Sequence, residues 1–125
     1  MKIDLNYNTN NMATIKSFSD LEQSKKLAEI LPLESADMYL WSSGKRYYIE
    51  AMDDGDFNEE EGHVRAWSLA ALLGVMPEIQ GGKPIIALDD NYITYPHMSD
   101  LHTKTDNLVD ACVAMIEKLY ELKML

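Results

Sequence analysis

Two histidines and one carboxylate lie close together in the second half of the chain. His97, Asp100 and His102 fall within six residues of a predicted loop. Imidazole nitrogens and carboxylate oxygens are ligands that zinc and iron accept, and a metal bound in this way activates water for hydrolysis. The spacing is loose and a loop offers these side chains little support, so ordinary surface residues are the alternative interpretation.

A second concentration of possible ligands is acidic. The chain has 21 acids against 11 bases and a net charge of −10. Seven of the acids lie within twelve residues that contain no base, so fourteen acids against eleven bases remain elsewhere. Like charges at this density repel one another, which predicts a mobile, solvated loop over residues 53–62. The seven acids are Glu50, Asp53, Asp54, Asp56, Glu59, Glu60 and Glu61.

This acidic segment has only the first half of a calcium-loop pattern. Asp54, Asp56 and Asn58 alternate as the first ligands of an EF-hand do. Glu59, however, occupies the place of the required glycine, and Arg65 stands where the closing glutamate belongs. We therefore expect a solvated loop whose charge attracts a cationic partner or binds divalent ions loosely. The candidates for partner contact in this segment are Asp54, Asp56 and Glu60.

Aromatic side chains are concentrated in the predicted strands. Tyrosine and tryptophan give large contact areas while tolerating partial exposure, so one face of such a sheet can recognise a partner. The alternative is that helices cover one sheet face and the tyrosines complete the edge of the core, with their hydroxyl groups in water. The aromatic candidates for partner contact are Tyr39, Trp41 and Tyr47.

Other residues with reactive side chains fit structural roles. The single cysteine, Cys112, lies on the apolar face of a predicted helix and excludes both an internal disulfide and a cysteine-based zinc site. Ser68 lacks the glycine-flanked setting of a nucleophilic serine, and no phosphate-binding pattern surrounds Gly81 and Gly82. The sequence therefore favours a non-enzymatic protein without a cofactor.

Charge and hydropathy exclude further classes of protein. With a pI near 4.6 and only two arginines, the chain lacks the clustered cations that bind nucleic-acid phosphates or anionic lipids. No apolar run approaches the ~20 residues of a membrane helix, and the first residues lack the apolar core of a secretory signal. We therefore expect a cytoplasmic protein that binds neither nucleic acid nor membranes directly.

Hydropathy periods and turn residues predict the elements that position these side chains. Ser19 and Glu22 form a capping-box pattern, and apolar residues then recur at helical spacing until Pro32. Turn residues at 42–45 and 89–91 separate β-favouring runs, which predicts two hairpins. The predicted elements are a helix over 19–31, a hairpin of 38–41 with 46–49, a helix over 66–75, a hairpin of 85–88 with 92–95, and a helix over 107–124.

These elements predict an α+β fold, in which two hairpins make a small, mostly antiparallel sheet packed against about three helices. Residues 12–125 would form a single domain. Residues 1–11 are rich in asparagine and are predicted to be a flexible segment, with a short strand through Ile3 and Leu5 as the alternative.

Two segments together resemble known proteins. Residues 66–73, followed by Pro77, and residues 107–116 resemble short uncharacterised proteins of phages and mobile elements of gut anaerobic bacteria. The resemblance implies a bacterial cytoplasmic setting and brings no catalytic residues with it.

Three functions follow from these observations as hypotheses. The first is a small, non-enzymatic protein-interaction or accessory module of a mobile element or phage. The second is an acidic decoy of nucleic acid that binds a basic protein, and the third is a metal-dependent hydrolase using His97 and His102. The last helix is apolar over more than half its circumference, including Val109, Val113 and Tyr120. This also predicts a homodimer that uses part of this helix or the helix over 66–75.

Overall fold

A computed structural model describes residues 3–4, 16–53 and 55–125. It confirms the α+β class. Most of the segment predicted to be flexible, residues 1–11, lies outside the described residues. Within that segment Ile3–Asp4 form strand β1, which agrees with the alternative of a short first strand.

Four antiparallel strands form the first sheet, in the order β1-β3-β2-β4. The predicted hairpin is confirmed at its centre, where Trp41 of β2 pairs with Tyr48 of β3. Gly44 supplies the positive φ of 67° that the hairpin turn requires. The added strands are β2 (Met38–Ser43), β3 (Arg46–Ala51) and β4 (Val64–Ala66).

Three antiparallel strands form a second, separate sheet in the order β5-β6-β7, so the two hairpins contribute to two sheets rather than one. The prediction of a hairpin over 85–95 is confirmed. The following segment is a strand rather than the predicted loop, because Leu101 is buried against the core while its polar neighbours on β7 face outward. The strands are β5 (Ile85–Ala87), β6 (Tyr92–Tyr95) and β7 (Met98–Lys104).

The described helices are α1 (Leu21–Ile30), α2 (Leu69–Val75) and α3 (Leu108–Glu121). Asp20 and Gln23, not Ser19 and Glu22, form the capping box of α1. The Ser19 hydroxyl instead accepts a hydrogen bond, at 3.0 Å, from the backbone N–H of the buried Trp67, which directly follows β4. Ser68 and Asn107 cap α2 and α3 as the chain enters each helix.

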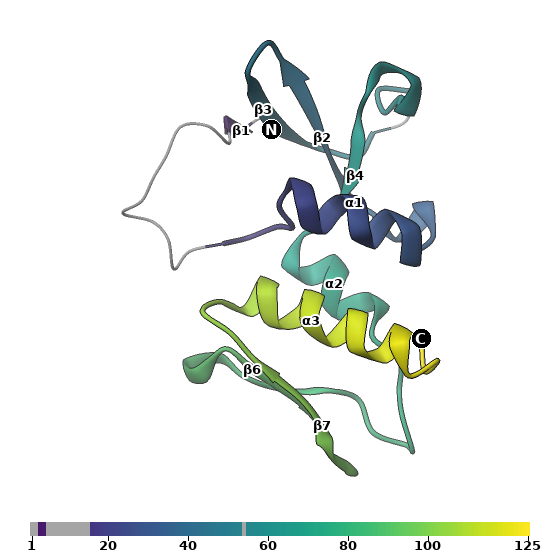
Figure 1. Ribbon diagram of the computed structural model, residues 1–125, viewed down its shortest axis with the longest axis vertical. Coiled ribbons are helices and arrows are strands. Elements are labelled where there is room, and N and C mark those ends of the chain that lie inside the picture. Colours follow the sequence, from purple (N-terminus) through teal and green to yellow (C-terminus); the bar gives the residue numbers. More distant parts are fainter. Residues whose placement is uncertain (1–2, 5–15, 54) are drawn as a thin grey trace.

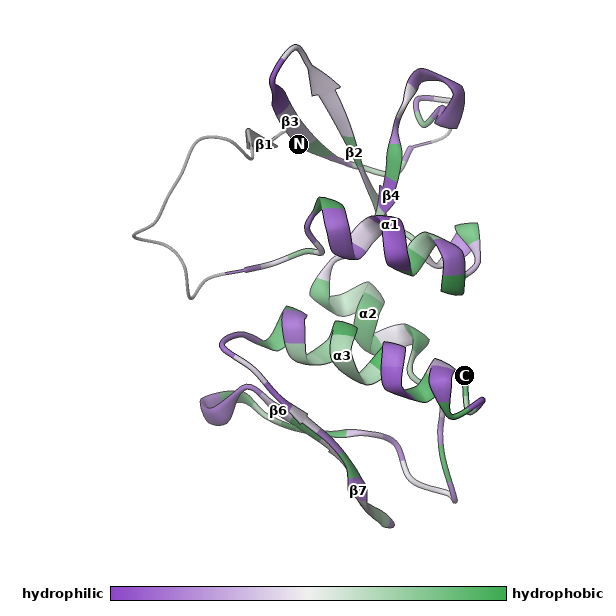
Figure 2. Ribbon diagram, in the orientation of Figure 1, coloured by the Kyte–Doolittle hydropathy of each residue, from purple (hydrophilic) through white to green (hydrophobic). Residues whose placement is uncertain are grey.

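The helices lie between the two sheets as a central layer (Figure 1). In Figure 2, α2 is mostly hydrophobic, whereas hydrophobic and hydrophilic residues alternate along α1 and α3. One core cluster joins the helices to the second sheet, and a smaller cluster of Leu40, Ile49 and Ala66 joins the first sheet to the start of α1. The largest fully buried side chains of the main cluster are Trp67, Tyr95, Leu27, Leu72, Ile93, Leu101, Met115, Ile116 and Leu119.

No helix within the described parts of the chain is both long enough and apolar enough to span a membrane.

Candidate interaction surface

The acidic connection between β3 and β4 contains hydrogen-bonded structure, which differs from the mobile loop predicted for residues 53–62. Asn58 caps a short 3₁₀ helix, Glu59–Glu61, by accepting a hydrogen bond from the Glu60 N–H at 2.9 Å. The Asn58 N–H in turn donates to Nδ1 of His63 at 3.0 Å. Gly62 then reverses the chain with a φ of 86°. Charge repulsion alone does not determine the conformation of this segment, because hydrogen bonds between local polar groups close it into a turn.

Aromatic stacking attaches this connection to the first sheet. Tyr39 is on the sheet face opposite Leu40, yet it is only 3% exposed because two rings from the connection cover it. The Phe57 ring meets it edge-on at 5.7 Å, and the His63 ring stacks on it at 4.9 Å. Tyr39 therefore supports the rings of Phe57 and His63, and its own ring is not accessible to a partner. The prediction that Tyr39 contacts a partner is wrong.

The buried phenol is also bound by a carboxylate. The Tyr39 hydroxyl donates to Oε2 of Glu50 at 2.8 Å. Burial, followed by this hydrogen bond and the nearby negative charges, raises the pKa of Tyr39 to about 12. Tyr39 thus stays a neutral hydrogen-bond donor throughout the physiological range.

An arginine fixes one end of the acidic connection. Arg65 Nε lies 3.3 Å from Oε1 of Glu59, and its Nη1 donates to the carbonyl of Leu31 at 3.4 Å. The carboxylates themselves remain exposed, and the coil leading into β4 is hydrophilic in Figure 2. We call this set the acidic surface; its members are Asp53, Asp56, Glu59, Glu60 and Glu61. Asp54, which was also a candidate, lies outside the described residues.

The other aromatic candidates occupy opposite faces of the first sheet. Trp41 is half-buried on the outer face, where its ring stacks on that of Tyr48 at 4.8 Å. Tyr47 points to the inner face and packs against the cluster that contains Leu40 and Ile49. The three aromatic candidates therefore do not form one contact face, since the strand alternation separates Tyr47 from the other two.

The candidate metal ligands lie on the second sheet. His97 occupies the turn before β7, and Asp100 and His102 follow on that strand, all three exposed. The His102 ring stacks on Tyr92 at 5.8 Å. Within the described ranges the structure forms no group of three or more His, Cys, Asp or Glu side chains able to share a metal ion. The acidic surface follows β3 of the other sheet, and none of its described carboxylates joins these histidines in a group that could hold a metal ion.

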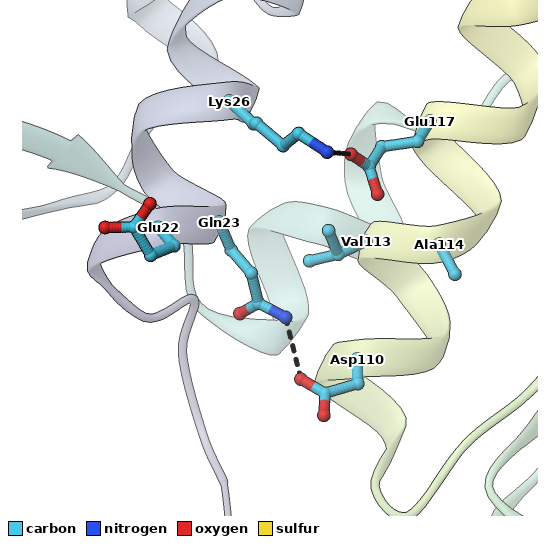
Figure 3. A pocket seen from close by; sticks show the side chains of 7 residues that line it. All are labelled: Glu22, Gln23, Lys26, Asp110, Val113, Ala114 and Glu117. Carbon is cyan, nitrogen blue, oxygen red and sulfur yellow. Dashed lines mark hydrogen bonds and ion pairs between the residues drawn. The ribbon is translucent and has the colours of Figure 1, made fainter.

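A hollow of about 400 Å³ lies between α1 and α3 (Figure 3). Asp110 accepts hydrogen bonds there from Lys16 Nζ at 2.7 Å and from Gln23 Nε2 at 2.8 Å. Lys26 and Glu117 form an ion pair of 3.0 Å across the same hollow. Because each of these charged groups already has a partner on the opposite element, the hollow serves as a polar seam between the two helices.

Hydrogen bonding lowers the pKa of Asp110 despite its partial burial. Burial raises the pKa of this carboxyl group, but hydrogen bonds from Lys16 and Gln23 and the charge of Lys16 outweigh burial. The net effect is that the pKa of Asp110 lies below its usual range.

The nucleophile candidates have structural roles. Cys112 is fully buried, and burial raises the pKa of its thiol to about 12. The Ser68 hydroxyl caps α2 and donates to Oδ2 of Asp37, while the Ser68 N–H donates to Oδ1 of the same carboxylate at 2.8 Å. Both residues therefore contribute to the fold rather than to a reactive site.

The apolar flank of the last helix is mostly covered within the chain. Val109 and Val113 are buried, so neither is free to pair with a second copy. Apolar exposure remains only near the end of the helix, where Tyr120 is 53% exposed and Leu122 is also exposed.

Sequence patterns did not single out Phe57, His63 or Arg65 as parts of the surface. The sequence did contain a local signal: Phe57 precedes the turn-forming Asn58 within the acidic run, and His63 lies five positions after Asn58. The contact with Tyr39, which is distant in sequence, is what holds these residues together as a surface.

In comparisons with known proteins, the chain matched no protein-family model, no curated protein and no solved structure.

Proposed function

We propose that this protein is a small interaction module that binds a basic protein partner through the acidic surface. The observation that supports this proposal is the stack of Phe57 and His63 on Tyr39, which gives exposed carboxylates a defined position. A charged surface that is already ordered loses less conformational entropy on binding than a flexible tail does. Its field also accelerates encounter with a cationic partner.

The shape of the acidic surface favours an ordinary contact with a basic protein over imitation of a nucleic acid. The carboxylates come from one short connection, residues 53–61, and they form a compact patch rather than the long rows of a duplex. The resemblance of residues 66–73 and 107–116 adds a setting to the proposal, an accessory protein of a phage or mobile element in the bacterial cytoplasm.

The test measures binding of a fluorescently labelled lysine-rich peptide by anisotropy at low ionic strength. In one variant three carboxylates of the acidic surface are neutralised by Asp56→Asn, Glu60→Gln and Glu61→Gln. The control variant removes the same charge elsewhere through Asp89→Asn, Asp90→Asn and Glu121→Gln, all at exposed positions.

We expect the first variant to bind about tenfold more weakly, because close charges dominate when salt screening is low, and the control to bind as the parent does. Equal weakening in both variants would show that binding depends only on the net charge of the protein, and it would overturn the proposal. Unchanged binding in the first variant would overturn it as well.

A further inference from the structure

An apolar hollow of about 390 Å³ adjoins the acidic surface. One wall is the short 3₁₀ helix Leu33–Ser35, and the other is the beginning of the acidic connection. We call this hollow the anchor groove; the residues of its lining that matter here are Leu33, Glu34, Ala36, Met52, Asp53 and Phe57.

Both walls of the anchor groove are held in place by hydrogen bonds and ring contacts. On one side the Ser35 hydroxyl donates to the Pro32 carbonyl at 2.6 Å and accepts from Trp67 Nε1 at 3.0 Å. On the other side the Met52 N–H donates to the Asp37 carbonyl at 2.8 Å. The Phe57 ring is fixed against Tyr39. The groove is thus formed before any partner arrives, which favours binding.

The lining combines apolar atoms with negative charge. Leu33 is 47% exposed, although the core buries most large apolar side chains of the chain. Glu34 and Asp53 place exposed carboxylates at the rim, and no Lys, Arg or His is among the residues that line the groove. An apolar side chain flanked by cations matches both properties, whereas an acidic segment would be repelled.

We infer that the anchor groove receives an apolar side chain from a lysine- or arginine-rich segment of the partner protein. This inference rests on the proposed function and names the chemistry of the partner. The flanking cations lie against Glu34, Asp53 and the acidic surface, and the apolar side chain covers Leu33 and Phe57. Removing these carbon atoms from water adds affinity that charge alone does not supply.

The test compares two labelled peptides of equal length and charge. One has a leucine between two pairs of lysines, and the other has a serine at that place. For the parent protein we expect the leucine peptide to bind about fivefold more tightly, the effect of partly burying one leucine side chain. The variant Leu33→Ser should bind both peptides equally.

Leu88→Ser is the matched control, because Leu88 is 72% exposed and precedes β6 of the second sheet. This variant should keep the preference for leucine. Leu33 is an exposed side chain, so its replacement leaves the fold intact, which an unchanged thermal unfolding curve verifies.

The outcomes separate this inference from the proposed function. If both peptides bind the parent equally and still lose affinity on neutralisation of the acidic surface, the anchor groove is overturned while the proposed function stands. A preference for leucine that survives Leu33→Ser also overturns the anchor groove. If neither peptide binds, both proposals fail.

Discussion

The imidazole ring of His63 lies nearly parallel to the phenol ring of Tyr39, with ring centroids 4.9 Å apart and an angle of 20° between the planes. Tyr39 lies in β2 and His63 lies just before β4, in the acidic connection, so the stack closes the outer face over Tyr39. The sheet is thereby covered on both sides at this position, by the connection outside and by α1 inside.

Replacement of Phe57 by alanine should loosen the acidic connection. The change removes the edge-on ring from Tyr39 and opens part of the covered face. We expect a loss of about 1–2 kcal/mol in the free energy of unfolding, less than for a fully buried ring, and faster amide hydrogen exchange in residues 55–63. Phe57→Leu, which keeps apolar volume, should lose less. Unchanged exchange in Phe57→Ala would contradict the role given to this ring.

The Asp110 carboxylate should give the fold a dependence on acidic pH. Its pKa in the folded state lies below the ordinary value, so its contribution is fully present above the unfolded pKa, about 4, and disappears as the pH falls through the folded value. Asp110→Asn should therefore lower the melting temperature at pH 7, by the equivalent of about 1 kcal/mol after allowance for solvent screening.

The deficit of the same variant should shrink between pH 7 and pH 2, because protonation of Asp110 removes the charge that asparagine lacks. Thermal unfolding at the two pH values measures this, with Asp106→Asn, an exposed residue just before α3, as the control. An equal fall in melting temperature at both pH values would show that the loss comes from altered packing or hydrogen bonding of the side chain rather than from its charge.

Neutralisation of the acidic surface should not act uniformly on stability. Asp56→Asn and Glu60→Gln relieve repulsion among like charges, so the melting temperature should hold or rise slightly. Glu59→Gln removes the 3.3 Å ion pair with Arg65, so it should lower stability by up to about 0.5 kcal/mol. Differential scanning calorimetry of the three single variants distinguishes these effects. A large fall in either of the first two would mean that their carboxylates hold a specific structural contact.

Cys112 should resist thiol reagents while the protein is folded. Its side chain is inaccessible, and the thiol, with a pKa of about 12, is protonated near neutral pH. We expect negligible reaction with a disulfide reagent at pH 8 in the native state and one equivalent after unfolding in guanidinium chloride. Rapid native reaction would show that α3 opens far more readily than its buried residues imply.

Sequence patterns were sufficient for the elements that depend on local information. The helix around Cys112 and the hairpin around Gly44 follow from apolar spacing and turn chemistry, and both are present. Local patterns did not decide between neighbours with equal capping ability. Ser19 and Asp20 can both cap a helix, and the choice falls on Asp20 because the Trp67 N–H, far along the chain, takes the Ser19 hydroxyl.

The candidate site was less predictable, because its form depends on contacts between distant residues. The acidic composition identified the right segment, but its order comes from rings that meet across the fold, those of Tyr39 and His63. The alternation of β2 placed Tyr39 on an outer face, and nothing local indicated that this face would be covered. Leu33, likewise, gains its place in the anchor groove only because Met52, Asp53 and Phe57 lie beside it.

The separation of the fold into two sheets has a consequence for the order in which the chain folds. β5, β6, β7 and α3 are consecutive in sequence, and each strand of their sheet pairs with its neighbour along the chain. The first sheet must instead bring β4 back beside β2 across an intervening strand and the acidic connection. Closing that longer loop costs more chain entropy. Refolding should therefore begin in the C-terminal half, and the acidic connection should be among the last segments to reach its native position.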